Sequence, residues 1–415
     1  MWHHNVELLA YHDLDGRSGF KLAFQEGAGR CFLYVAGLWH SGWTVLEVTD
    51  PEHPELLRFV EGPPNTMTLQ VQVADRMMIT GLERPFPGLP LNGSAKPQDG
   101  FLIWDVNEPD RPQLLGRWLS GETGTHRNFY NGGRWVYATR TLPGFEGHIL
   151  AIVDIGDPTN PKLAGKWWYP GQHKDAGESY TAEEERRLTS GHPFPGEFGL
   201  GLHGGAYVVG DRAYCPWKRA GMVILDVSDK SNPKHVSTLS VYPPLGSTIA
   251  VHSAVPLVNR DVVVINSEAL HERGAEAVDY VATVDISDES DPMVMAVFPQ
   301  PRPPHSYSAR GFAEKGGRSG PHNQHQQQGL ACLAPNDRLV YLAYFNAGLQ
   351  IYDITDPRDP HITGYYIPDD PAERRGPIPG KLVHQAEDVL VDRRGVIYLS
   401  EGNSGIYILT HNPSQ

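Results

Sequence analysis

A short motif repeats along the chain, and it constrains the fold more than any other feature. The clearest copy is GLQIYDITDPRDP at residues 348–360. Six related stretches begin at Gly42, Gly100, His148, Gly221, Tyr280 and, in a shortened form, Gly405. Each copy leads from apolar residues into an acidic residue and then a turn, in which Asp accepts backbone N–H groups and Pro fixes φ. Copies spaced roughly 50 to 70 residues apart indicate a solenoid or a propeller.

Each repeat expands into four short strands. In residues 329–368 these are GLACLAP, RLVYLAYF, GLQIYDITDP and HITGYYIP, which we expect to run from the hub to the rim of one blade. The strands are rich in β-branched and aromatic residues, and Gly or Asp-Arg turns join the first to the second, as is typical of propeller blades. Seven such units predict an all-β fold, a seven-bladed β-propeller in which residues 1–415 form a single domain.

The two ends of the chain predict how the ring closes. The last unit supplies strands at residues 384–392, 396–400 and 405–409 but no fourth strand. Residues 5–11 (NVELLAY) resemble residues 54–60 (PELLRFV), which form a fourth strand elsewhere in the pattern. We therefore expect the N-terminal strand to complete the last blade and protect an edge that would otherwise be open.

The repeat core resembles that of the LVIVD-repeat family. The family core, (L/I)-x-I-(V/Y)-D-(V/I)-(S/T)-D-P, is matched by LQIYDITDP at residues 349–357. The resemblance covers nearly the whole chain and implies the propeller fold. It implies no activity, because the family is defined by its strands and not by a site.

Composition and charge argue against several classes of partner. The formal net charge of -14 disfavours nucleic acid and anionic membranes. No apolar run approaches the length of a bilayer span, and residues 1–16 lack the features of a signal peptide. Three cysteines without metal-type spacing predict buried thiols in a reducing compartment. We therefore expect a cytoplasmic protein.

One face of the disc is expected to carry the ligand site. In a four-stranded blade, connections from the second to the third strand and from the outer strand to the next blade emerge on the same face. The long, irregular connections are all of these two kinds, at residues 82–99, 171–202, 300–328 and 369–383. Unequal elaboration of one face is where a ligand site is expected. Residues 179–190 give a helical signal with Thr181 as the expected N-cap.

Histidine recurs near the start of the innermost strand in five consecutive blades. Crowded, unpaired imidazoles are costly to bury, whereas inner-strand ends converge around the axis to within reach of one ion. The pattern predicts a divalent metal ion (Mn, Fe or Zn) as cofactor. The expected ligands are His203, His252, His325 and His384, with His126 and His322 as alternates.

Further side chains on the same face are expected to support this site. Metal-bound imidazole usually donates its other N–H to a carboxylate, and the glutamates that end second strands, Glu83, Glu268 and Glu401, suit that role. A clamp for an anionic substrate is expected from Arg140, Lys218 and Arg219, although a surface salt bridge is the competing interpretation of each. Tyr344 and His271 are the expected proton-transfer groups.

These expectations lead to three hypotheses of function. The first is a metalloenzyme in which an axial ion acts as a Lewis acid on a small carboxylate or phenolic substrate, by β-elimination, hydration or isomerisation. Such a site is similar in geometry to that of oligogalacturonate lyases, propellers that hold Mn with three His and a Gln. The second is O₂ chemistry at Fe(II), because carotenoid-cleavage oxygenases are propellers with a similar axial set of four His. The third is a non-catalytic propeller that binds proteins.

Overall fold

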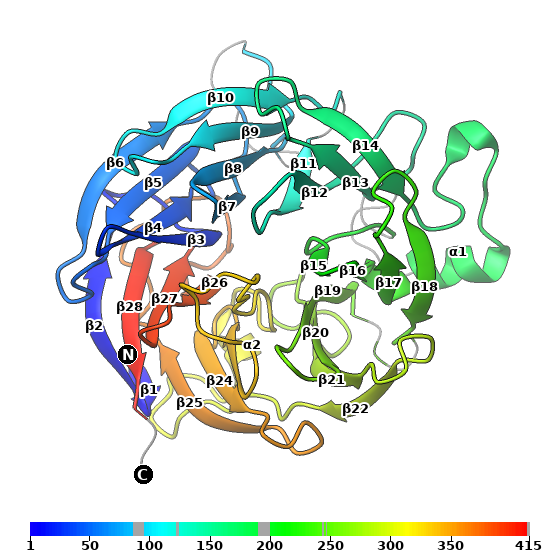
Figure 1. Ribbon diagram of the computed structural model, residues 1–415. Coiled ribbons are helices and arrows are strands. Elements are labelled where there is room, and N and C mark those ends of the chain that lie inside the picture. Colours follow the sequence, from blue (N-terminus) through cyan, green and yellow to red (C-terminus); the bar gives the residue numbers. More distant parts are fainter. Residues whose placement is uncertain (86–94, 122–123, 190–199, 243–244, 246, 413–415) are drawn as a thin grey trace.

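The computed structural model describes residues 1–85, 95–121, 124–189, 200–242, 245 and 247–412. Within these residues the strands form seven antiparallel four-stranded sheets, arranged around a ring like the blades of a propeller (Figure 1). The predicted all-β, seven-bladed architecture is therefore confirmed. No helix in the described part of the chain is long and apolar enough to cross a membrane.

The first five blades each use four consecutive strands, ordered from axis to rim. Blade one contains β3 (Leu22–Gly27), β4 (Arg30–Ala36), β5 (Gly42–Glu47) and β6 (Glu55–Glu61). Blade two contains β7 (Val71–Ala74), β8 (Met77–Leu82), β9 (Gly100–Asp105) and β10 (Gln113–Trp118). Blade three contains β11 (Thr125–Phe129), β12 (Trp135–Arg140), β13 (Ile149–Asp154) and β14 (Lys162–Trp167). Blade four contains β15 (Tyr207–Val209), β16 (Arg212–Pro216), β17 (Met222–Asp226) and β18 (Lys234–Leu239). Blade five contains β19 (Ile249–Pro256), β20 (Val262–Glu268), β21 (Val281–Asp285) and β22 (Met293–Val297).

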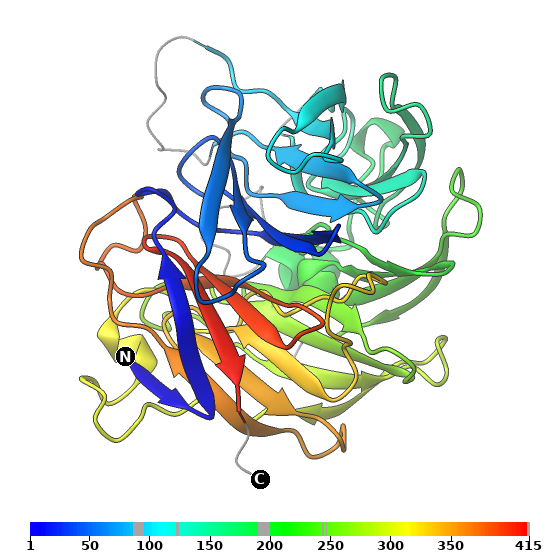
Figure 2. The ribbon, with the colours of Figure 1, turned by 60° about the vertical axis from the view of Figure 1, so that its left-hand side comes forward.

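The last two blades combine both ends of the chain (Figure 2). Blade seven contains β26 (Ala386–Val391), β27 (Val396–Glu401) and β28 (Gly405–His411), and β2 (Val6–His12) is its rim strand, paired from Val6↔His411 to His12↔Ile406. This confirms the predicted closure. Blade six contains β23 (Leu339–Ala343), β24 (Leu349–Asp353) and β25 (His361–Ile367), and its rim strand is β1 (Trp2–His4), which was not predicted.

The innermost segment of blade six differs from the prediction. The expected strand GLACLAP at residues 329–335 forms turns instead, closed by a bond from the Leu333 N–H to the Leu330 carbonyl. Residues 322–325 take the inner place, because the backbone N–H groups of His322 and His325 donate to Ala343 and Tyr341 of β23, each at 2.9 Å. Apolar composition was the wrong guide here, since the side chains of this inner segment are polar.

The repeated acidic residues shape the turns as expected. The Asp353 carboxylate accepts the Thr355 N–H at 2.8 Å, and Asp356 accepts the Arg358 N–H at 2.9 Å. The first of these bonds has equivalents at Asp105, Asp154, Asp226 and Asp285. The apolar residues before each turn pack between neighbouring blades, so the motif fixes both the turn and the core of each unit.

The long connections all leave the ring on one face, because each joins the second strand of a blade to its third or one blade to the next. Residues 171–202 contain η1 (Lys174–Ala176) and α1 (Ala182–Thr189), and residues 300–328 contain α2 (Phe312–Lys315). A further 3₁₀ turn, η2 (Lys218–Ala220), joins β16 to β17. Thr181 caps α1 as expected: its Oγ accepts the Glu184 N–H at 3.2 Å, while the Glu184 carboxylate accepts the Thr181 N–H at 2.9 Å. Residues 86–94 and 190–199 of these connections lie outside the described residues.

Candidate metal centre on the propeller axis

Four histidines from successive blades form a row at the axis. His126 comes from β11, His203 precedes β15, His252 comes from β19, and His322 begins the inner segment of blade six. Their ring centroids are separated by 4.5, 5.1 and 4.9 Å in that order, and all four side chains are buried. The ring of blades therefore brings together His126, His203, His252 and His322, which we call the axial histidine row.

Glu268, the last residue of β20, lies at the centre of this row. Its Oε2 atom is 3.0 Å from His203 Nε2 and 3.5 Å from His252 Nε2. Its Oε1 atom is 3.7 Å from His322 Nε2. One candidate ligand atom from each of His203, His252 and Glu268 lies within 4.8 Å of the other two. We call these three residues the triad; the glutamate expected behind the imidazoles lies among their nitrogens instead.

The donor chemistry of the triad fits a divalent metal ion. His252 Nδ1 shares a 2.7 Å hydrogen bond with Ser253 Oγ, while its Nε2 is buried and makes no hydrogen bond. Two imidazoles and one carboxylate form a ligand set used for Fe(II) and for catalytic Zn²⁺. The unpartnered His252 Nε2 is an atom for which burial without a ligand is costly.

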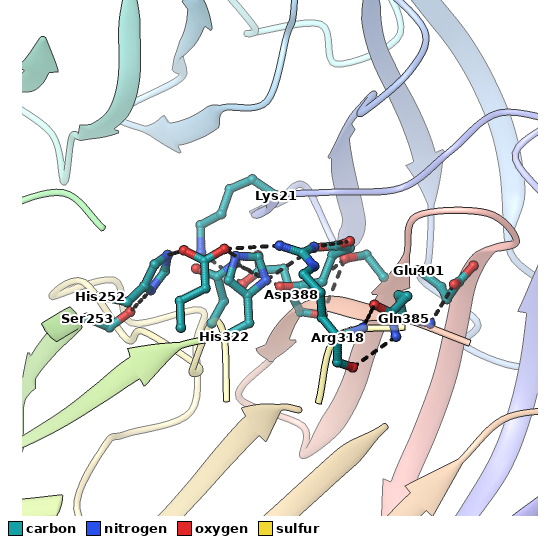
Figure 3. Close-up of polar contacts among 12 residues, drawn as sticks. Lys21, His252, Ser253, Arg318, His322, Gln385, Asp388 and Glu401 are labelled. Atoms are coloured by element: carbon teal, nitrogen blue, oxygen red, sulfur yellow. Dashed lines mark hydrogen bonds and ion pairs between the residues drawn. The ribbon is translucent and has the colours of Figure 1, made fainter. Parts of the chain in front are cut away.

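Arg318 and Glu387 complete the polar surroundings of the triad, and sequence reasoning missed both. Arg318 Nη1 lies 3.2 Å from Glu268 Oε1, and its Nη2 lies 3.1 Å from Glu387 Oε1. Glu387 Oε2 lies 3.2 Å from His322 Nδ1. Figure 3 shows Arg318 and His322 between His252 on one side and Glu401 on the other. A signal existed for Glu387, because two adjacent acidic residues, Glu387 and Asp388, inside an inner strand are unusual.

Burial and nearby charges favour the protonation states that bind metal. Burial lowers the pKa of His203, His252 and His322 well below 6.5, so these imidazoles are neutral. Burial alone would raise the pKa of Glu268, but the guanidinium charges of Arg318 and Arg127 lower it and favour the ionised carboxylate. Neutral imidazole and ionised carboxylate are the forms that coordinate metals. Burial raises the pKa of Glu387 to about 7, even beside Arg318.

Glu83 holds the far end of the row. Its two carboxylate oxygens lie 3.1 and 3.0 Å from His126 Nδ1, and the His126 ring stacks on His203. Glu83 thus makes the carboxylate contact that was expected behind an axial imidazole. His126 is not one of the residues whose ligand atoms converge, so it supports the triad by packing.

Two of the expected ligands, His325 and His384, lie outside the axial histidine row. His325 Nε2 donates to the Ala334 carbonyl at 2.9 Å, and its Nδ1 accepts the Val391 N–H at 3.1 Å, so both ring nitrogens join backbone segments. The His384 ring packs on Tyr407, 6.3 Å between centroids, with its Nδ1 4.0 Å from Glu401. The Glu401 carboxylate accepts backbone N–H groups from Gln385 and Asn403 at 2.8 and 2.7 Å, which is a structural role.

His325 is expected to make the fold sensitive to acid. Burial lowers its pKa to about 4, so between 6.5 and 4 the unfolded chain binds a proton that the folded chain does not. Stability is therefore lost as pH falls through this window, by on the order of 3 kcal/mol from this group. In urea unfolding at pH 7 and pH 4.5, His325→Gln, which does not titrate, should lose less stability than the parent. Equal losses would contradict this assignment.

The expected anion clamp is spread over blades three and four. Arg140 is fully buried, with its Nε donating to the Thr141 carbonyl at 2.9 Å and its guanidinium 4.8 Å above the Trp118 ring. Lys218 is buried in η2. Its charge lowers the pKa of His203, although burial and His126 contribute more to that lowering. The Arg219 guanidinium lies 5.5 Å above the Tyr242 ring. These contacts hold Arg140 and Arg219 against other parts of the chain and not against the triad.

The contacts described for the expected proton-transfer groups are with residues other than the triad. The Tyr344 hydroxyl donates to Gln300 Oε1 at 2.5 Å within the core between blades five and six, and burial raises its pKa well above 10. The His271 N–H donates to Glu276 Oε1 at 2.7 Å in the connection that follows β20. Tyr344 is therefore a packing residue, and Glu387 is the better-placed titratable group.

Comparisons with known proteins bear on the fold. The LVIVD repeat model matches residues 144–167, 206–240 and 338–367. A protein from Lactobacillus plantarum aligns at 12% identity and a TM-score of 0.51, over 94% of this chain and 98% of its own. The periplasmic gluconolactonase PpgL of Pseudomonas aeruginosa aligns at 10% identity and 0.56, over 96% and 97%. The WD40 β-propeller domain of Doa1 aligns at 9% identity and 0.53, over 98% and 96%. No curated protein matches the chain. At these identities the likeness establishes the fold alone.

Proposed function

We propose that this seven-bladed propeller built from LVIVD repeats is an enzyme that binds one divalent metal ion through His203, His252 and Glu268. The observation that carries the proposal is the convergence of two imidazole nitrogens and a carboxylate oxygen from blades four and five. Burial keeps both imidazoles neutral, while the charge of Arg318 favours the ionised form of Glu268. The site is thus prepared for a metal by electrostatics as well as by position.

The leading reaction class is lyase, hydratase or isomerase chemistry on a small carboxylate or phenolic substrate. A bound Mn, Fe or Zn ion would supply Lewis acidity toward an oxygen of that substrate. Arg318 lies beside the triad and offers positive charge to an anionic substrate. Glu387, in contact with both Arg318 and His322, is placed to hold or accept a proton, and burial brings its pKa to about 7. Glu387 therefore takes the acid–base role that the sequence assigned to Tyr344 and His271.

A second candidate is Fe(II)-dependent oxygenase chemistry. The observation that favours it is the composition of the triad, because two histidines and one carboxylate are the ligand set of many non-haem iron oxygenases. The metal that accompanies the purified protein separates the candidates: iron supports the oxygenase, and manganese or zinc supports the lyase-type enzyme. Nitric oxide, which binds Fe(II) where O₂ would bind, should give a nitrosyl EPR signal in the first case.

The experiment that tests the proposal is a calorimetric titration of metal-free protein with Mn²⁺, Fe²⁺ and Zn²⁺, the iron under anaerobic conditions. We expect one ion bound per chain. If none of the three metals binds stoichiometrically, the enzyme proposal fails and the protein-binding propeller takes its place.

Ser253 offers a mild test of how the triad is oriented. Ser253→Ala removes the 2.7 Å partner of His252 Nδ1 and leaves every triad residue in place. Loss of such an outer partner typically weakens metal binding by about 10- to 100-fold, and we expect a weakening of that size in the titration. The matched control is Ser237→Ala, which removes a hydroxyl bonded to the Glu289 carbonyl near the rim and should leave affinity unchanged. Equal affinities in both variants would remove Ser253 from the site.

A further inference from the structure

Arg127 is a buried cation with unused hydrogen-bond donors. Its side chain comes from β11 and the residue is 2% exposed. Its Nη2 atom lies 3.4 Å from His322 Nε2, and its guanidinium lies 4.9 Å above the Phe20 ring. Its Nε and Nη1 atoms are buried and have no hydrogen-bond partner. A guanidinium is always charged, so two unsatisfied donors on it carry a large desolvation cost.

The carboxylates near Arg127 are already engaged by other groups. Glu83 contacts His126, and Glu268 contacts Arg318 and His203. Glu387 contacts Arg318 and His322, while Asp388 forms a 3.1 Å ion pair with Lys21. Within the described residues none of these four carboxylates forms an ion pair with Arg127. The guanidinium therefore has no counter-ion in direct contact.

A small cavity on the axis adjoins Arg127. Polar side chains from blades one, two, three and six line it together with the backbone of Gly204 and Gly205; besides Arg127 they are Lys21, Gln70, Gln72, Asn128, Asn323 and Gln326. The described lining contains two cations and no acidic side chain. The cavity has room for about one particle of the size of a water molecule. A halide ion is slightly larger than water, so its binding requires a small movement of the lining side chains.

We propose that this cavity binds one monovalent anion of halide size, chloride or bromide, with Arg127 Nε and Nη1 as its donors. The anion supplies the missing counter-charge, and the amide side chains of Gln70, Gln72 and Asn323 surround it. An oxyanion as large as sulfate does not fit the space. Because the anion binds the folded ring and not the unfolded chain, it stabilises the protein in proportion to its concentration. The proposal does not require the metal, since the direct side-chain contacts described for Arg127 are with His322 and Phe20 and not with the triad.

Bromide diffraction tests the proposal directly. Crystals of metal-free protein are grown without halide and soaked in sodium bromide, and anomalous data are collected at the bromine edge. We expect one bromide in the axial cavity, within hydrogen-bonding distance of Arg127 Nε and Nη1. A cavity that holds water or nothing while bromide binds elsewhere would overturn it. Metal-free protein is used so that failure here is distinct from failure of the metal site.

A melting experiment provides the solution counterpart. Tm of the metal-free protein should rise in sodium chloride or bromide relative to sodium gluconate at equal ionic strength. Arg127→Met should lose the difference between salts, whereas Arg358→Met, at an exposed arginine, should keep it. Gln72→Leu serves as a milder cavity variant if Arg127→Met does not fold, and it should reduce the difference. The same Tm in all three salts for the parent protein would contradict the proposal.

Discussion

Replacing His252 by alanine is expected to remove stoichiometric binding of a divalent metal while the propeller stays folded. His252 contributes the buried, unpartnered Nε2 that faces Glu268, 3.5 Å from its Oε2. Losing a ligand should cost more than losing an outer partner, so affinity should fall by at least about 100-fold in calorimetric titration. Circular dichroism checks that the variant is folded.

His325→Ala is the matched control for this result. It removes a buried histidine from the neighbouring blade, but one whose ring nitrogens are both bonded to backbone groups. It should lower the free energy of unfolding and leave metal affinity unchanged. The opposite pattern, in which His325→Ala abolishes metal binding and His252→Ala does not, would contradict the triad.

Deleting residues 1–12 is expected to destabilise the whole ring. The deletion removes β1 and β2, so that β25 and β28 each expose an unpaired edge and Val6 no longer packs in its core. We expect the free energy of unfolding to fall by several kcal/mol, which is a large part of the ~5 to 15 kcal/mol that stabilise a typical domain. Denaturant unfolding and soluble yield measure this effect.

A shorter deletion distinguishes the contribution of β1 to stability from that of β2. Removing residues 1–4 deletes β1 alone, whose three residues extend the rim of blade six, and should have a much smaller effect. If the protein lacking residues 1–12 unfolds at the same denaturant concentration as the parent, β2 is dispensable and closure by the N-terminus does not stabilise the ring.

The repeats made the fold predictable because each carries its own turn chemistry. The Asp side chains that accept N–H groups at Asp226, Asp285 and Asp353 recur at the same place in each unit, and the strands before them share one apolar pattern. The closure of the ring by the N-terminus could be predicted because residues 5–11 repeat the pattern of a rim strand. The strand β1 gave no such signal, because its residues Trp2–His4 are too few to show a period.

The inner segment of blade six shows where sequence patterns misled. Residues 329–335 are apolar and resemble a strand, whereas residues 322–325 are polar and form the segment that faces the axis. Polar residues occupy a strand-like position when they serve a site, so hydrophobicity points to the wrong segment there.

The candidate ligand set was predictable in part. His203 and His252 were recognised because their blades share one register. His322 and His325 are three residues apart, and residues at that spacing in an extended segment point to opposite sides. Only His322 faces Glu268. Arg318 lies in a long connection, and the position of such a segment over a site is set by tertiary packing that no local pattern records.

The most direct test of the axial metal centre is a crystal structure of the protein grown with Mn²⁺, Fe²⁺ or Zn²⁺, with anomalous data collected at the edge of that metal. The arrangement of the triad predicts one peak, bonded to His203, His252 and Glu268. A metal-free triad, or a peak bound elsewhere, such as beside His384 and Glu401, would contradict it.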